Sequence, residues 1–571
     1  MMGQMRHCLV SSWICCSLLF LVSGEEQLEL GSPADCEKAD FVPGHNLGGE
    51  GFDIVKMERK GSYVIDMEKW DTGNGSCKMF NNPYLNNVKQ KVPAAVVFWR
   101  TLPTCSMKVS SKIFESSEAL VNDSTSSITN NWKVGLDVKF ISSVSLGGTH
   151  SREARFGMEK SKEDKYSFTK HLIQCRFYTY QITRSPSLHQ EFLQAVQSLP
   201  ADPNSEAYEE IIDRFGTHYI TNVELGGKMK AVTAIRTCKA AMSGLRGTAI
   251  KDCLEVEASG TYNSATLSTE SKYCRELQSK MKTNEKFSSM FSERQTEIVG
   301  GNINGEDLLF SSTSHKTALN NWLKSLKTIP DVVMYKLYPL HSVLKTTHHA
   351  RVGLKKAVEK YILKNALKNV CSGSCKIGHK NSARDHCACI CKANENIMSN
   401  CCPPEKGLAS LRVYKLYAND LFGDSYGKTD GVVQVKYGST VRRTAVISDD
   451  DNPRWRESFY FGPVRLSMSE SLTFEVYDAD NYWNSDLLGT CSFSLKSGVV
   501  SDECVFTHGT FFFSYSVKCA PSLEGSMCAD YKPSPMAAPL AQIFQSRNGI
   551  LVKDLWKIQN YTNTLHFKGY N

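Results

Sequence analysis

The sequence predicts an α+β domain built around a bent antiparallel sheet, followed by a small disulfide-rich module and an all-β sandwich. Three observations support this prediction. Strand-like and helix-like segments mix over residues 36–370, cysteines are concentrated between Val370 and Cys402, and short strands separated by turns begin at Leu408. A chain of 571 residues is long enough for several such domains.

Residues 1–24 have the pattern of a secretory signal peptide. Arg6 precedes an apolar stretch over residues 8–22, and Ser23 and Gly24 offer small residues for cleavage. A signal anchor that stays in place is the alternative. After Gly24 no apolar run approaches the ~20 residues that a membrane-spanning helix needs, so we expect a secreted mature protein.

The cysteine count and the sequons agree with secretion. Three of the 21 cysteines lie within residues 1–24, which leaves 18, an even number that favours disulfides in an oxidising compartment. Asn74, Asn122 and Asn560 each begin an N-glycosylation sequon. The formal net charge of +8 without a dense Lys/Arg block favours anionic surfaces and does not indicate nucleic-acid binding.

The first domain, predicted over residues 25–369, shows one strand pattern and several helix patterns. Val134, Leu136, Val138 and Phe140 alternate with polar residues, as in a half-exposed strand. Apolar residues at helical spacing predict four helices, whose markers are Leu188/Phe192/Val196, Tyr208/Ile211/Ile212/Phe215, Leu319/Trp322/Leu323/Leu326 and Val358/Tyr361/Ile362.

Residues 370–407 form the predicted cysteine-rich module, with seven cysteines. A segment this short cannot build an apolar core, so it needs covalent cross-links. His379 and His386 beside the cysteine run at 387–391 suggest zinc as an alternative, which an oxidising compartment disfavours. We expect the seventh cysteine to pair outside the module, with one of the seven cysteines upstream. The module resembles an epidermal-growth-factor-like (EGF-like) domain.

The sandwich, predicted over residues 408–530, has strand patterns at 411–417, 432–437, 458–461 and 472–477. Residues 531–571 form a C-terminal extension without a clear pattern. Five aspartates lie in two loops of the sandwich: Asp424 and Asp430 before one strand, and Asp478, Asp480 and Asp486 after another. Clustered carboxylates repel one another unless a cation is bound, and calcium takes six to eight oxygen ligands. We therefore predict a Ca²⁺ site; separate solvated turn aspartates are the alternative.

This spacing resembles the calcium-dependent phospholipid-binding sandwiches of synaptotagmin and protein kinase C. The resemblance implies that Gly423 and Ala479 add backbone carbonyl ligands. Four aromatic residues lie in the same loops: Phe422, Tyr426, Tyr482 and Trp483. Exposed aromatics suit a bilayer interface, so we expect them to contact membrane, although each could instead pack against the sandwich.

Residues 215–227 read FGTHYITNVELGG, with Phe215, Gly216, Thr217 and His218 followed by the pair Gly226 and Gly227. This motif resembles the signature of the membrane-attack-complex/perforin superfamily. The resemblance implies that the two glycines lie at the bend of the central sheet, which straightens on membrane insertion. No nucleophile motif accompanies His218, so we expect a structural histidine.

The resemblance also implies two helical clusters that flank the sheet and refold into amphipathic β-hairpins. We assign them to residues 151–181 and 262–298. Tyr166, Phe168, Cys175 and Phe177 alternate with polar residues, as a barrel strand requires. As a helix, the second segment brings Tyr273, Leu277 and Met281 onto one face.

We therefore expect a secreted, granule-stored cytolytic protein that binds phospholipid membranes through calcium, assembles into a homo-oligomeric ring and inserts a β-barrel pore. Passage of other effector proteins through that pore is left open. A non-lytic secreted calcium-dependent lipid-binding or adhesion protein is the alternative. An enzyme is not expected, because neither a Gly-x-Ser-x-Gly elbow nor a His-Glu-x-x-His site is present.

Overall fold

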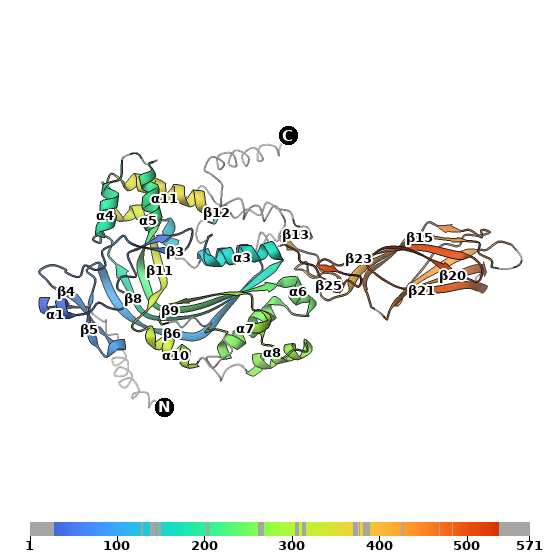
Figure 1. Ribbon diagram of the computed structural model, residues 1–571, viewed down its shortest axis with the longest axis horizontal. Coiled ribbons are helices and arrows are strands. Elements are labelled where there is room, and N and C mark those ends of the chain that lie inside the picture. Colours follow the sequence, from blue (N-terminus) through green and yellow to red (C-terminus); the bar gives the residue numbers. More distant parts are fainter. Residues whose placement is uncertain are drawn as a thin grey trace, which may run out of the picture.

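The computed structural model describes residues 28–535 apart from 127–129, 138–143, 146–149, 201, 203–204, 261–267, 303–307, 311–315, 369–374, 376, 381–388, 424, 426, 468 and 482–483. The predicted signal peptide and residues 536–571 of the predicted extension lie outside the described residues. A helix-and-sheet domain and a β-sandwich lie at opposite ends of an elongated molecule, with the cysteine-rich segment between them (Figure 1). This confirms the predicted fold class.

A seven-stranded antiparallel sheet forms the centre of the first domain. Its three long strands, β6 (Val96–Phe114), β8 (Tyr166–Ile182) and β9 (His218–Arg236), lie side by side in the order β9-β8-β6. The order continues beyond β9 to β2 (Glu50–Asp53) and β3 (Glu58–Tyr63).

The edge of β9 that faces away from β8 pairs with two different strands along its length. β11 (Asp331–Pro339) pairs with the first half of β9, as far as Gly226, and β10 (Arg294–Val299) pairs with the second half, from Lys228 onward. Across the sheet, Gly226 and Gly227 stand opposite Arg176 and Cys175 of β8, next to a register shift in that strand. The glycine pair therefore marks the place where the sheet changes direction.

Gly226 is required there by close backbone packing. A Cβ at this position would lie 1.9 Å from the carbonyl oxygen of Cys175, and one at Gly227 would lie 2.5 Å from the Trp322 ring. Only glycine lets the neighbouring backbone and side chains approach so closely.

Helices cover the sheet in two groups. At one end lie α4 (Gln190–Gln197), α5 (Glu206–Phe215) and α11 (Arg351–Asn365), while α10 (Lys316–Ser325) packs Trp322 against the glycine bend. Ser205 begins α5 because its hydroxyl accepts a hydrogen bond from the Ala207 N–H (3.3 Å). All four predicted helices are confirmed.

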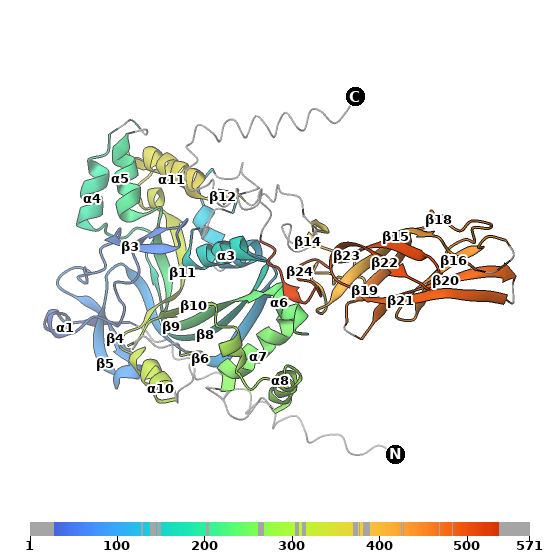
Figure 2. The same ribbon diagram turned by 45° about the vertical axis from the view of Figure 1, so that its right-hand side comes forward.

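At the other end, two helical clusters lie on opposite sides of the sheet (Figures 1 and 2). The first consists of α2 (Ser117–Ser126) and α3 (Arg152–Glu163). The second consists of α6 (Thr237–Met242), α7 (Gly247–Gly260), α8 (Ser268–Lys280) and α9 (Phe287–Met290).

These positions correct the cluster boundaries expected from the sequence. Residues 166–181, assigned to the first cluster, already form the central strand β8, and Phe168 and Cys175 are buried in the sheet. The first cluster instead consists of α2 and α3, which precede β8 in the chain. In the second cluster α6 and α7 precede the expected start, and residues 294–298 belong to β10. Leu277 of α8 and Met281, which directly follows this helix, pack inward, but Tyr273 is exposed.

The predicted strand at Val134–Phe140 is also wrong over its described part. Residues 130–133 form the 3₁₀ helix η2 (Asn130–Lys133), and 134–137 form a turn and irregular chain. Trp132 is buried beside His218, so burial of this side chain overrides the alternating pattern. Val138 and Phe140 lie outside the described residues.

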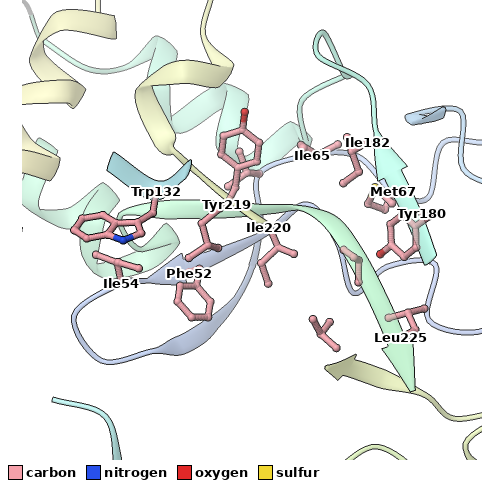
Figure 3. Close-up of a cluster of buried hydrophobic side chains, with 14 of the residues drawn as sticks. Phe52, Ile54, Ile65, Met67, Trp132, Tyr180, Ile182, Tyr219, Ile220 and Leu225 are labelled. Carbon is pink, nitrogen blue, oxygen red and sulfur yellow. The ribbon is translucent and has the colours of Figure 1, made fainter. Parts of the chain in front are cut away.

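The core of the first domain lies where β2, β9, β11 and the helices meet. Phe52, Ile54, Trp132, Tyr219 and Ile220 converge there (Figure 3), and each is less than a tenth exposed. A small sheet of β1 (Glu29–Gly31), β4 (Cys77–Asn82) and β5 (Val88–Val92) packs beside it, next to α1 (Pro33–Lys38).

Disulfides join the parts of the chain. Cys402, the last cysteine of the cysteine-rich segment, pairs with Cys238 of α6, as the expected pairing with an upstream cysteine requires. Cys389 and Cys391 are bonded to Cys375 and Cys401, so these two cysteines cannot be zinc ligands. The remaining described bridges are Cys36–Cys77, Cys105–Cys175, Cys253–Cys274, Cys491–Cys504 and Cys519–Cys528.

The sandwich consists of two antiparallel sheets. One contains β15 (Leu408–Asn419), β18 (Arg454–Trp455), β19 (Phe459–Arg465), β22 (Gly498–Val505) and β23 (Thr510–Cys519). The other contains β16 (Gly431–Tyr437), β17 (Thr440–Arg443), β20 (Ser471–Asn481) and β21 (Asn484–Ser494). The four predicted strands are present.

Short elements complete the chain: η1 (Pro83–Leu85), η4 (Leu340–Val343), β7 (Val144–Ser145) with β12 (Leu367–Lys368), β13 (His379–Lys380) with β14 (Cys389–Ile390), and β24 (Leu523–Glu524) with β25 (Asp530–Tyr531). Across the described part of the chain, no helix has both the length and the apolar character needed to cross a membrane.

We predict that Gly226→Ala lowers the free energy of unfolding by about 1–3 kcal/mol or more, because the added methyl overlaps the Cys175 carbonyl. Gly260→Ala is the matched control, since a Cβ there meets no atom within 4 Å. Thermal unfolding of the full chain measures both. Equal unfolding temperatures for the two variants would contradict the close packing at the bend.

Candidate functional site

We call the two loops that carry the five aspartates predicted to bind Ca²⁺ the cup; the first contains Asp424 and Asp430. The cup lies at one end of the sandwich, where β16 begins and β20 ends. Gly431 stands opposite Asp478 in the β16–β20 pairing. The Asp430 N–H donates a hydrogen bond to Asp478 Oδ1 (2.7 Å), and the Ala479 N–H donates to the Asp430 carbonyl (2.9 Å). The carboxylate of Asp478, only 3% exposed, is therefore held in one orientation beside Asp430.

Gly423 lies directly against this carboxylate. A Cβ at Gly423 would lie 1.4 Å from Asp478 Oδ2, so only glycine allows the first loop to approach the second. The backbone of the first loop thus lies beside a buried carboxylate oxygen. Such a set of carboxylate and backbone oxygens suits a hard cation such as Ca²⁺.

The other predicted ligands are less completely described. Asp424 lies outside the described residues, and for Asp480 only the backbone, in β20, is described. Asp486 is exposed and stands opposite Asp478 in the β20–β21 pairing. Among the described residues, no three His, Cys, Asp or Glu side chains are close enough together to form a metal centre.

A third acidic loop, Asp449–Asp450–Asp451, was missed from the sequence. The Asp449 N–H donates to Asp430 Oδ1 (2.8 Å), and Asp451 Oδ1 accepts a hydrogen bond from the Thr429 N–H (3.0 Å). The Asp451 carbonyl also accepts from the Leu421 N–H (2.9 Å). Three consecutive aspartates were visible in the sequence, but only the fold brings them to the cup.

Of the four predicted membrane-contacting aromatics, Phe422 is described, and it is 54% exposed. Tyr426, Tyr482 and Trp483 lie outside the described residues. Among the predicted glycosylation sites, Asn74 lies in an exposed turn with φ 58°, Asn122 is in α2, and Asn560 is not described.

The signature residues bind the start of β9 to its neighbours. The Thr217 hydroxyl accepts from the Ile54 N–H (3.1 Å), and His218 Nε2 is 2.8 Å from the Trp132 carbonyl. Burial lowers the pKa of His218 to about 3, so the ring is neutral and serves structural contacts. Gly216, with φ 78°, ends α5 against the Phe52 backbone; Phe215 is fully buried.

The first helical cluster is held on the sheet by charged side chains. Glu153 of α3, only 5% exposed, forms ion pairs with Lys170 of β8 (2.6 Å) and Lys230 of β9 (2.8 Å). Lys170 also pairs with Asp123 of α2 (2.7 Å), and Lys230 with Glu297 of β10 (2.6 Å). We call these five side chains the charged interface.

A cavity of about 870 Å³ lies beside this interface, between α3 and the strands β8 to β11. Its lining contains charged side chains from both surfaces, including Lys228, Lys230, Glu153 and Glu297. The contact between helices and sheet here therefore combines a polar, incompletely packed region with a smaller apolar one, in which Leu120 and Phe156 pack against buried residues of β8 and β9.

Neighbouring charges keep the acids of the interface ionised. Burial would raise the pKa of Glu297, but Lys228 and Lys230 outweigh that effect and lower it to about 2. The pKa of Glu153 is likewise lowered, because Lys230 and Lys170 outweigh its burial.

The second cluster is attached differently. The Cys253–Cys274 disulfide joins α7 to α8, and the carboxylate of Glu257 accepts hydrogen bonds from the Phe287 and Ser288 N–H groups at the start of α9. The helices of this second cluster also share a separate apolar core, which includes Ile250, Leu254 and Phe287.

Three family profiles match this chain in order. The MAC/Perforin domain matches residues 43–370, the Perforin-1-like EGF domain residues 370–404, and the C2 domain residues 409–508. The chain is similar to Perforin-1 of Homo sapiens (37% identical over 513 residues, covering 88% of this chain and 92% of the relative). Perforin-1 of Rattus norvegicus is 36% identical over 503 residues, covering 86% and 91%.

A more distant similarity extends to complement. The Complement component C8 alpha chain of Oryctolagus cuniculus is 22% identical over 361 residues, covering 58% of this chain and 61% of the relative.

We predict that Glu153→Ala destabilises the first domain by about 3 kcal/mol, because it leaves buried lysines without one partner. Glu159→Ala is the control, since Glu159 is an exposed acid on the same helix. Denaturant unfolding at neutral pH compares the two variants. An unchanged midpoint for Glu153→Ala would show that the interface does not hold α3.

Proposed function

Because the chain belongs to the membrane-attack-complex/perforin family, we propose that it is a pore-forming cytolytic protein. It is secreted, binds target membranes through calcium, assembles into rings and inserts β-hairpins that close into a barrel. Storage in a secretory granule and passage of other effector proteins through the pore are part of this proposal. Its activity is membrane perforation, and no catalytic step is assigned.

One observation carries the mechanism. Each helical cluster lies between two strands that are already antiparallel partners: α2 and α3 between β6 and β8, and α6 to α9 between β9 and β10. Extending each strand pair into its cluster would continue an existing ladder of hydrogen bonds. Since lipid provides no partner for backbone N–H and C=O groups, such pre-paired hairpins suit insertion.

The lengths agree with this proposal. α2 has 10 residues and α3 has 12, and a tilted strand crosses a bilayer with about 9–11 residues. The charged interface beneath α3 also supports it, because ion-paired side chains regain hydration when a helix leaves the sheet, which offsets part of the pairing that is lost.

Membrane capture is proposed to begin at the cup. Asp430 and Asp478, with Asp424, Asp480 and Asp486, would hold Ca²⁺, assisted by the Gly423 and Ala479 carbonyls. Bound calcium supplies positive charge that offsets the carboxylates. Phe422, together with Tyr426, Tyr482 and Trp483, would then enter the bilayer interface.

We predict that Asp430→Ala abolishes calcium-dependent sedimentation with liposomes. Asp502→Ala should bind as the unmodified chain does, because Asp502 is an exposed aspartate of β22 outside the cup. The assay compares calcium with a chelator. Equal binding of the unmodified protein under both conditions would refute calcium dependence.

Acid should suppress vesicle binding without releasing the first helical cluster. Protons compete with calcium for carboxylate ligands, so binding falls at about pH 5, near the upper end of carboxylate titration. The lowered pKa of Glu297, about 2, means that its stabilising charge is present above about pH 4.5 and is lost only as pH falls towards 2. Hydrogen exchange in α3 should therefore be the same at pH 5 and pH 7 after correction for intrinsic rates.

A disulfide within the first cluster should block leakage but not binding. Ser117 of α2 and Gly157 of α3 suit it, because a Cβ at Gly157 would lie 3.5 Å from the Ser117 Cβ. Continuing the β6–β8 register beyond Phe114↔Phe168 would place Ser117 opposite Lys165, eight residues from Gly157 (165 − 157). The disulfide is thus compatible with the helices and incompatible with the extended hairpin.

Dye release from liposomes tests Ser117→Cys/Gly157→Cys before and after mild reduction, with each single cysteine variant as a control. Leakage should return on reduction. If the oxidised variant leaks like the unmodified chain, the hairpin mechanism is wrong; if the unmodified chain binds but never leaks, the non-lytic alternative holds.

A further inference from the structure

The loop between β22 and β23 lies at the same end of the sandwich as the cup. Gly509, with φ 84°, packs against the first cup loop: a Cβ there would lie 2.5 Å from the Asp420 carbonyl oxygen. His508 contacts Phe422, with ring centroids 5.6 Å apart. The loop and the first cup loop are therefore one continuous surface.

This surface carries exposed apolar side chains. Phe422 is 54% exposed, Leu487 53% and Val505 75%, and the Phe506 ring is anchored inward over Gly489 of β21. Phe422 lies in a loop, whereas Leu487 and Val505 lie in β21 and β22 near the strand ends at the cup. Apolar groups exposed at one end of a domain indicate an interaction surface. Because this surface is continuous with Phe422, which is proposed to enter the bilayer interface, the partner that fits it is a phospholipid bilayer.

We infer that residues 505–509 form a further lipid-contacting loop, so that the whole end of the sandwich, rather than the cup alone, enters the bilayer interface. This inference rests on the proposed function.

β22 provides a matched test. Val505 and Val499 are exposed to 75% and 71% on the same strand, but Val505 is at the cup end and Val499 is near the opposite end. Val505→Asp should weaken calcium-dependent binding to phosphatidylcholine vesicles about tenfold, and Val499→Asp less than twofold. If Phe422→Ala weakens binding but Val505→Asp does not, the inference is overturned while the proposed function stands. If neither variant weakens binding, the membrane-contacting site itself is wrong.

A second observation concerns the junction between α3 and β8. Asp164 ends α3 with its carboxylate fully buried. That carboxylate accepts hydrogen bonds from the Tyr531 hydroxyl and the Ser534 N–H (2.8 Å), and it lies 3.6 Å from Arg236 of β9. Residues 530–534, which we call the strap, thus reach from beyond the sandwich to the first helical cluster, in the place where Figure 1 shows β25.

Strand pairing and packing against a disulfide hold the strap in place. Tyr531 pairs with Leu523 of β24 and packs against the Cys238–Cys402 disulfide. Lys165, the next residue after Asp164, donates to the Asn400 carbonyl of the cysteine-rich segment. Burial, together with Asp164, raises the pKa of Tyr531, so its hydroxyl keeps the proton that it donates.

In the proposed mechanism α3 becomes a continuation of β8, so residues 163–166 must change conformation. We propose that the strap is an autoinhibitory contact that holds this junction in its helical form until the sandwich has docked. This proposal also rests on the proposed function.

The test removes the two donors with Tyr531→Phe/Ser534→Pro. Tyr477→Phe is the control, because the Tyr477 hydroxyl also donates to a carboxylate, that of Glu475, within the sandwich. The double variant should bind vesicles normally and leak about tenfold faster, the effect of losing a charge-assisted hydrogen bond. Without vesicles, its amides at 160–168 should exchange faster.

Leakage and exchange equal to the control would overturn the strap proposal while leaving pore formation intact. If the double variant is not secreted, Tyr531→Phe alone provides the same comparison, with faster leakage expected and an unchanged rate contradicting the proposal. Absence of leakage from the unmodified chain would refute the proposed function instead.

Discussion

The antiparallel pairing of β8 with β6 on one side and β9 on the other is the constraint on which the rest of this structure depends. It satisfies the backbone of three long strands, and each helical cluster is inserted between two strands of the resulting sheet. Both clusters are insertions between strands that are already paired. A change from helix to strand would therefore add to a ladder with an existing register, and closed pairing is what a membrane requires of strands.

The two ends of the sheet are stabilised by different physical interactions. At the end with α4, α5 and α11, the helices pack on the sheet through a large apolar core that includes Phe192, Phe215 and Val358. At the end with α3, ion pairs beside a large cavity connect helix to sheet, together with a smaller apolar contact through Leu120 and Phe156. A domain arranged in this way can keep one half rigid while the other half refolds, with Gly226 and Gly227 lying between the two halves.

The sandwich and the cysteine-rich segment lie between the proposed membrane-capture site and the α3 end of the sheet. The cup lies at the far end of the sandwich, whereas the strap and the Cys238–Cys402 disulfide lie at the near end, against α6 and the α3–β8 junction (Figures 1 and 2). Membrane docking at the cup and release of the α3–β8 junction by the strap are the two proposed steps. They are thus connected through a single β-sandwich, which provides a physical route between them.

Local patterns in the sequence were enough to predict many of the helices and strands. Periodicity identified α4, α5, α10, α11 and the four predicted sandwich strands, because their apolar faces are continuous along the chain, and cysteine parity pointed to a bridge out of the cysteine-rich segment. The sequence alone misplaced the first cluster by assigning β8 to it, since apolar residues alternate with polar ones in this strand of the central sheet just as they do in an amphipathic hairpin. It also missed Asp449–Asp451, Asp164 and the strap. These depend on contacts between residues far apart in the chain, such as Asp164 with Tyr531, and only tertiary packing decides which distant groups lose water and must find each other as partners.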